Sequence, residues 1–134
     1  MKHSIFLIFF LAGCIYSNRG FAQIEQDTAI YGEVVFDTLK FDLGEISADK
    51  TIKIEVKYYN KGPGLLKIYK VITPCVCTEA THQQEGLEMG KWGSVTLTFN
   101  PAKVPKGIFK RTATILHDGS DKGFDQIELT GVIK

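Results

Sequence analysis

Apolar and polar residues alternate with a period of two along much of this 134-residue chain. In residues 51–58, apolar side chains at 52, 54, 56 and 58 alternate with Lys53, Glu55 and Lys57. The same period recurs in residues 95–99 and 127–131. Successive side chains of a β-strand point to opposite faces, so each run predicts a strand with one buried face.

Clusters of glycine, proline, asparagine and aspartate separate these runs. Such residues pre-set or tolerate the dihedral angles of turns. Strands are predicted near residues 34–42, 51–60, 65–73, 76–82, 93–100, 109–116 and 125–132, and no helix is predicted after residue 22. Short strands at a spacing of roughly ten residues, without intervening helices, favour an all-β, immunoglobulin-like antiparallel β-sandwich of about seven strands over a barrel.

The N-terminus predicts export from the cytoplasm. Lys2 precedes an apolar run over residues 5–15, and small residues follow it. The run is about half the ~20 residues that cross a bilayer, so it indicates a secretory signal peptide and not a transmembrane helix. Gly20 and Ala22 predict cleavage near Ala22-Gln23, which leaves a secreted, periplasmic or cell-surface protein.

A second processing site competes with the first. Residues 11–14, Leu-Ala-Gly-Cys, look like a bacterial lipobox, in which Cys14 carries lipid and provides the one expected route to a membrane. With cleavage after Ala22, the expected organisation is a signal peptide over 1–22, a tether or edge strand over 23–33 and the sandwich domain over 34–134.

The charges exclude one class of partner. Residues 1–22 hold two basic residues and no acidic one, so 14 basic and 15 acidic residues remain and the net charge is −1. These charges are interspersed without a basic cluster, so nucleic acid is not an expected partner. The sequence also lacks a Gly-x-Ser-x-Gly elbow and a phosphate-binding loop, and we expect no enzyme of those classes.

The sequence Pro74-Cys75-Val76-Cys77 is the main candidate for chemistry, with His82 a few residues later. In a straight strand, residues i and i+2 face the same side with Cα atoms roughly 6.5–7 Å apart, the outer limit for a disulfide. A kink at Pro74 would shorten that distance. Four states stay open: a static disulfide, a redox-active disulfide, a copper or zinc site that includes His82, and two reduced, partly buried thiols.

Aromatic and histidine side chains give further expectations. Trp92 lies in a turn between two glycines, where its ring can cover the end of the sandwich or stand out as a binding contact. Strand edges offer a second route to binding, by pairing with a partner strand. His117 is expected in a solvated hairpin loop. Core positions are expected for Phe36, Phe41, Tyr58, Phe99 and Phe109.

Seven short motifs, in order, resemble domain-of-unknown-function family 1573. They are FDLGEI (41–46), YNKG (59–62), LKI (66–68), CVCT (75–78), GKWG (90–93), GIFK (107–110) and LTG (129–131). This family of small secreted or lipid-anchored bacterial proteins is similar to the immunoglobulin-like domains of the Hydin group. The resemblance covers about residues 36–133 and implies a fold more firmly than a function, because the family lacks an assigned activity.

Two positions depart from the family pattern. Met89 stands where a proline usually precedes the turn glycine, and Val76 stands where glycine usually separates the two cysteines. Glycine permits the tight backbone that a disulfide between such close residues needs, so Val76 makes that disulfide harder to form.

The sequence as a whole predicts a secreted, non-enzymatic binding or structural module of the bacterial cell envelope that needs no cofactor. Its expected partner is an unidentified protein or cell-envelope component. The alternative is a thiol-based redox or soft-metal-handling protein that uses Cys75 and Cys77. Replacing both cysteines by serine would abolish the second function and spare the first.

Overall fold

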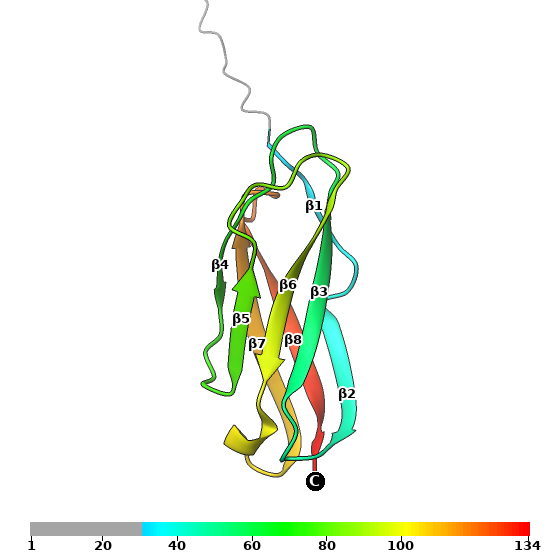
Figure 1. Ribbon diagram of the computed structural model, residues 1–134, viewed down its shortest axis with the longest axis vertical. Coiled ribbons are helices and arrows are strands. Elements are labelled where there is room, and N and C mark those ends of the chain that lie inside the picture. The colour runs from blue at the N-terminus through cyan, green and yellow to red at the C-terminus, as the bar shows by residue number, and fades with distance from the viewer. Residues whose placement is uncertain (1–30) are drawn as a thin grey trace, which may run out of the picture.

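The computed structural model describes residues 31–134, so the predicted signal peptide, its cleavage site and Cys14 lie outside the described residues. The elements are β1 (Val34–Phe36), β2 (Lys40–Ile46), β3 (Ile52–Asn60), β4 (Ile68–Ile72), β5 (Thr78–His82), β6 (Trp92–Phe99), the 3-10 helix η1 (Pro101–Lys103), β7 (Gly107–His117) and β8 (Phe124–Ile133). They form two sheets, in the orders β1-β3-β6-β5 and β2-β8-β7-β4. One sheet lies in front of the other in Figure 1, and the predicted all-β sandwich is confirmed.

The first predicted strand, over residues 34–42, is divided between the two sheets. β1 pairs antiparallel with β3, whereas β2 pairs parallel with β8. The Asp37 N–H donates to the Lys57 carbonyl at 3.0 Å, and the Leu39 carbonyl accepts from the Glu128 N–H at 2.8 Å. The chain therefore leaves the front sheet after Asp37 and has joined the rear sheet by Leu39.

Two other predicted strands are shorter in the structure. β4 begins at Ile68, because Leu66 instead forms an isolated bridge with Leu87 through hydrogen bonds of 2.9 and 2.7 Å. β5 begins at Thr78, because its N–H donates to the Cys75 carbonyl at 3.1 Å and closes a turn over the two cysteines. Among residues 31–134, no helix is long and apolar enough to cross a membrane.

The core follows the alternation in the sequence. Ile54, Val56 and Tyr58 of β3 are buried, while the residues between them face solvent. Phe99 of β6 stacks on Phe109 of β7 with ring centroids 5.1 Å apart, which joins the two sheets. Burying a side chain of this size contributes roughly 1.5–3 kcal/mol. Of the other expected core aromatics, Tyr58 is buried, and Phe36 and Phe41 are partly buried against the same cluster.

The expectation that His117 is solvated is wrong, because the residue is only 2% exposed. Its Nδ1 accepts a hydrogen bond from the Gly119 N–H at 3.1 Å, so the proton of the neutral ring lies on Nε2. Nε2 is 2.9 Å from Oδ2 of Asp125 and donates to it. His117 therefore holds the β7–β8 hairpin together.

Candidate functional site

Trp92 lies on the outer face of the front sheet, at the first residue of β6. It is in register with Tyr59 of β3, and Tyr59 is in register with Val35 of β1. Trp92 is 61% exposed and Val35 is 44% exposed. The Trp92 ring therefore stands out from the sheet and does not cover the end of the sandwich. We call Val35, Tyr59 and Trp92 the outer-face row.

A hollow of about 570 Å³ lies beside Trp92 and is lined by Asp37, Glu55, Lys57, Gln83, Trp92, Gly93 and Ser94. Its polar side chains include both hydrogen-bond donors and acceptors. On the core side of the same strand, glycine at position 93 makes room for the buried Tyr58 ring, because a Cβ there would lie 2.6 Å from Cζ of Tyr58. The hollow and the outer-face row form one continuous candidate site, since both include Trp92.

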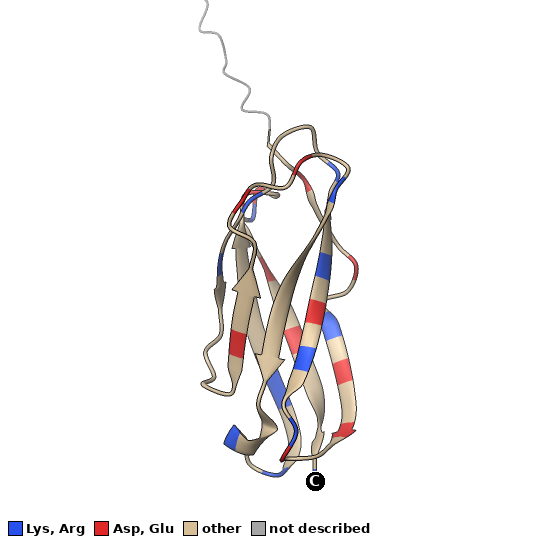
Figure 2. Cartoon of the chain, in the orientation of Figure 1, with Lys and Arg blue, Asp and Glu red and all other residues tan. Residues whose placement is uncertain are grey.

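The charge distribution separates β6 from its neighbours. Figure 2 shows β6 without any charged residue, beside alternating basic and acidic residues on β3. The outward residues of β6 that follow Trp92 are Ser94, Thr96 and Thr98, and all three are partly buried. The outer face therefore has an uncharged stripe, with the charged side chains at its border.

Cys75 and Cys77 form a disulfide, with their Cα atoms 5.1 Å apart. The separation is shorter than that in a straight strand because the hydrogen-bonded turn from Cys75 to Thr78 folds the chain back. The expectation that Val76 hinders this backbone is corrected, since no non-glycine residue within 31–134 has a positive φ. Val76 projects from the turn and is 81% exposed.

Polar groups surround the disulfide. The Cys77 N–H donates to Sγ of Cys75 at 3.2 Å, and Oγ1 of Thr78 lies 3.5 Å from Sγ of Cys77. The Lys103 ammonium donates to the Val76 carbonyl at 3.4 Å. Lys103 comes from η1, which a hydrogen bond from the Asn100 N–H to the Cys77 carbonyl at 2.7 Å holds beside the turn.

The third predicted metal ligand lies elsewhere. His82 ends β5 at the opposite end from Cys77, and its Nδ1 is 2.9 Å from the Gln83 carbonyl oxygen. In the part of the chain that the structure describes, no group of three or more His, Cys, Asp or Glu side chains is placed to hold a metal ion. The structure therefore does not bring Cys75, Cys77 and His82 together.

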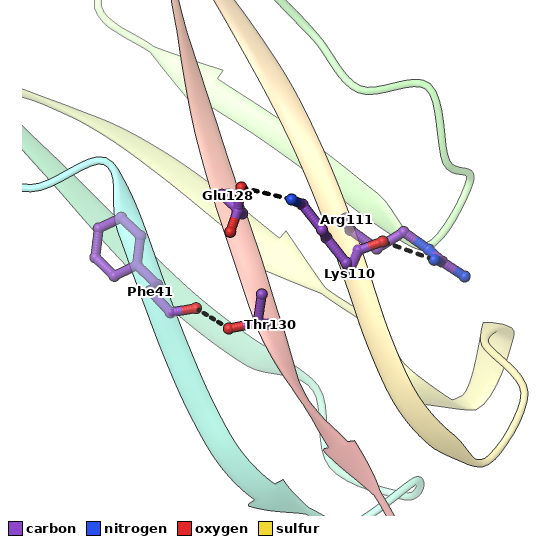
Figure 3. Close-up of polar contacts among 5 residues, drawn as sticks. All are labelled: Phe41, Lys110, Arg111, Glu128 and Thr130. Carbon is purple, nitrogen blue, oxygen red and sulfur yellow. Dashed lines mark hydrogen bonds and ion pairs between the residues drawn. The ribbon is translucent and has the colours of Figure 1, made fainter.

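Part of the β7 edge is left unpaired in the rear sheet. β4 pairs with residues 114–117 of β7 only, so residues 107–113 extend beyond it. Figure 3 shows the Arg111 guanidinium donating to the Lys110 carbonyl, at 2.8 Å, and the Lys110 ammonium paired with Glu128, at 3.0 Å. On the other side of β8, the Thr130 hydroxyl donates to the Phe41 carbonyl, at 3.5 Å. A charged side chain that occupies an edge carbonyl disfavours pairing with another strand, so this edge is the weaker candidate for binding.

The model of the family described as "Protein of unknown function (DUF1573)" matches residues 34–133. The chain belongs to this family. The resemblance in the seven motifs is thereby confirmed for nearly the whole described region. No match is found among curated proteins.

Several solved structures share the DUF1573 chain's fold. It is similar to a protein of unknown function from Porphyromonas gingivalis W83, with a TM-score of 0.68 and 17% identity over 78% of this chain and 48% of that chain. It is similar to the ASH / PapD-like domain 7 of human CEP192, with a TM-score of 0.62 and 11% identity over 78% and 87%. It is also similar to the YadV chaperone, with a TM-score of 0.52 and 15% identity over 76% and 52%.

These likenesses show the fold alone, an immunoglobulin-like and PapD-like sandwich. The DUF1573 chain spans about half the length of the P. gingivalis protein and of the YadV chaperone. A family without an assigned activity and neighbours of this fold are consistent with a non-enzymatic binding module.

Each candidate site includes a residue that the sequence did not predict: Tyr59 in the outer-face row and Lys103 beside the disulfide turn. Tyr59 was missed, although its outward position next to the inward Tyr58 can be read from the alternation in residues 51–58. Lys103 was missed because no pattern in the sequence relates it to cysteines more than twenty positions earlier. Its approach to Val76 depends on how η1 packs against the turn.

Proposed function

We propose that this chain is a secreted module of the bacterial cell envelope that binds a partner protein through the outer-face row and its hollow. The main support is the exposure of Trp92, at 61%, on a regular sheet beside that hollow. Tryptophan and tyrosine provide much of the binding energy at protein interfaces, because they bury large areas at low entropic cost.

The composition of the face favours a protein as the partner. Its outer-face row is apolar and aromatic, and the adjoining hollow is lined by the charged side chains of Asp37, Glu55 and Lys57. A desolvated centre with a polar rim is the usual arrangement of protein interfaces. The YadV protein, a neighbour of the same fold, is described as a chaperone, which agrees with a polypeptide ligand.

Export is supported by the apolar run over residues 5–15 and by the small residues before Gln23. The intact mass of the protein from its native host tests it. A chain that begins at Gln23 supports release into the periplasm or beyond, and a lipid-modified Cys14 supports a membrane-anchored envelope protein. A chain that retains Met1 in the cytosol contradicts export.

Photo-crosslinking in the native host tests the binding face. A photoreactive residue at Ser94 lies on the proposed face, whereas one at Thr112 of β7 lies on the outer face of the other sheet. We expect a discrete protein adduct from position 94 that Trp92→Ala removes, and none from position 112. No adduct from 94, or equal adducts from both positions, would contradict the proposal.

A further inference from the structure

We propose that the Cys75–Cys77 disulfide is a thiol–disulfide exchange site that oxidises a protein dithiol, with Cys75 as the sulfur that is attacked. This activity does not depend on the binding face around Trp92, since the two lie at different places on the sandwich. The disulfide closes the turn between β4 and β5, and the outer-face row crosses β1, β3 and β6.

The disulfide contributes little to holding the turn. It closes a loop of only three residues, for which the loss of chain entropy in the unfolded state stabilises the fold only weakly. Two backbone hydrogen bonds already hold the same segment, from Thr78 to Cys75 at 3.1 Å and from Asn100 to Cys77 at 2.7 Å. The pair of cysteines therefore has a weak structural role.

The two cysteines differ in exposure. Cys77 is 1% exposed, whereas Cys75 is half-buried between the exposed residues Pro74 and Val76. A thiolate of another protein can approach Cys75 without unfolding the sandwich. Attack on the buried sulfur is blocked, so exchange should start at Cys75.

A backbone donor at Cys75 and a cation elsewhere in the same turn favour a thiolate at this position. The Cys77 N–H points at Sγ of Cys75, and the Lys103 ammonium lies beside the Val76 carbonyl of the same turn. Hydrogen-bond donors and nearby cations stabilise thiolates and make cysteines reactive. With a neutral side chain at position 103, only the Cys77 N–H would remain to stabilise a thiolate at Cys75.

The exchange conserves atoms and electrons. A thiolate of the partner dithiol bonds to Sγ of Cys75, the Cys75–Cys77 bond breaks, and its electron pair leaves on Cys77, which takes up a proton. The second thiolate of the partner then attacks the partner sulfur that is bonded to Cys75. Cys75 leaves as a thiolate, which is protonated in turn. The partner becomes a disulfide, and this chain gains two electrons and two protons.

Single-cysteine variants of the full chain test the assignment, with Cys14→Ser in each. Cys77→Ser keeps Cys75, and Cys75→Ser keeps Cys77. With oxidised glutathione as the probe, intact mass measures the rate of mixed-disulfide formation. We expect the Cys77→Ser chain to react at least ten times faster than the Cys75→Ser chain. Adding Lys103→Gln to the Cys77→Ser chain should slow its reaction at least threefold. Rates within twofold for the two single variants would overturn the proposal.

The chain with both cysteines provides a second measurement in case a single variant fails to fold. Reduced glutathione should open the disulfide while the circular dichroism spectrum stays native, and peptide mapping should place glutathione on Cys75. A disulfide that resists reduction until the chain unfolds, or glutathione found on Cys77, would overturn the proposal.

Discussion

The indole of Trp92 packs against the phenol ring of Tyr59, with ring centroids 5.3 Å apart and ring planes at 51°. Tyr58, the preceding residue of β3, points into the core and is 1% exposed. Adjacent residues of one strand thus serve the core and the outer face. A binding face built on a paired strand is held more precisely than one on a loop.

Replacing Gly93 tests how closely the core supports this face. The Cβ of alanine at this position would lie 2.6 Å from Cζ of Tyr58. Overpacking of this kind costs roughly 1–3 kcal/mol, so urea denaturation should show that loss for Gly93→Ala. Ser94→Ala, on the outward side of β6, is the control and should change the free energy of unfolding by less than about 0.5 kcal/mol. Equal losses of unfolding free energy in the two variants would contradict the close packing of Gly93 against Tyr58.

The side-chain amide of Asn60 joins three segments at one end of the sandwich. Its Nδ2 donates to the carbonyls of Gly64 at 2.8 Å and Leu87 at 2.7 Å. Its Oδ1 accepts from the N–H groups of Glu33 at 3.1 Å and Gly62 at 3.0 Å. All four hydrogen-bonding positions of this fully buried side chain are therefore used.

Asn60→Ala should lower the free energy of unfolding by about 2–4 kcal/mol, because several buried backbone groups lose their partner at once. Asn100→Ala is the control, since that exposed side chain accepts one hydrogen bond, from the Ala102 N–H at 3.1 Å. It should cost no more than about 1 kcal/mol. Similar losses in urea denaturation would contradict the role of Asn60.

Tyr58 should make the fold sensitive to alkali. Burial raises the pKa of its phenol above the ordinary 10.0. The unfolded chain therefore loses this proton first, so the stabilisation is complete below about pH 10 and is lost as the pH rises through the raised pKa. Tyr58→Phe should reduce the fall in unfolding free energy between about pH 9.5 and 11.5. Tyr59→Phe, on the outer face, should keep the wild-type fall, and identical curves for all three chains would contradict this account.

Removing the disulfide should have a small effect on stability and none on binding. The double change Cys75→Ser and Cys77→Ser should lower the unfolding free energy by about 1.6 kcal/mol, as expected for so short a loop. When the photoreactive residue at position 94 is combined with this double change, the crosslinked protein adduct should persist. Its disappearance in a folded protein would show that binding depends on the disulfide turn.

The period-two pattern was sufficient to predict the fold class, because burial alternates locally along each strand. It did not predict the division of residues 34–42, since β1 and β2 have the same alternation and only their partners differ. It also placed His117 in solvent, because Asp118 and Gly119 indicate a loop. The burial of His117 depends on Asp125, across the hairpin.

The candidate sites were also only partly predictable. Trp92 could be singled out from its flanking glycines, but its contact with Tyr59 depends on the register of β3 and β6. The turn of Cys75 and Cys77 brings their Cα atoms to 5.1 Å, which a straight strand does not allow. Strand pairing decides the first arrangement, whereas a hydrogen-bonded turn between neighbouring residues decides the second.

The most direct test of the proposed binding face is the dissociation constant of the partner that crosslinks at position 94. Titration of the full chain should give a Kd that Trp92→Ala raises at least about 30-fold, equivalent to about 2 kcal/mol. Ile108→Ala removes a side chain that is 90% exposed on the other sheet, and it should leave Kd within twofold. A Trp92→Ala chain that binds as tightly as the Ile108→Ala chain would contradict the account.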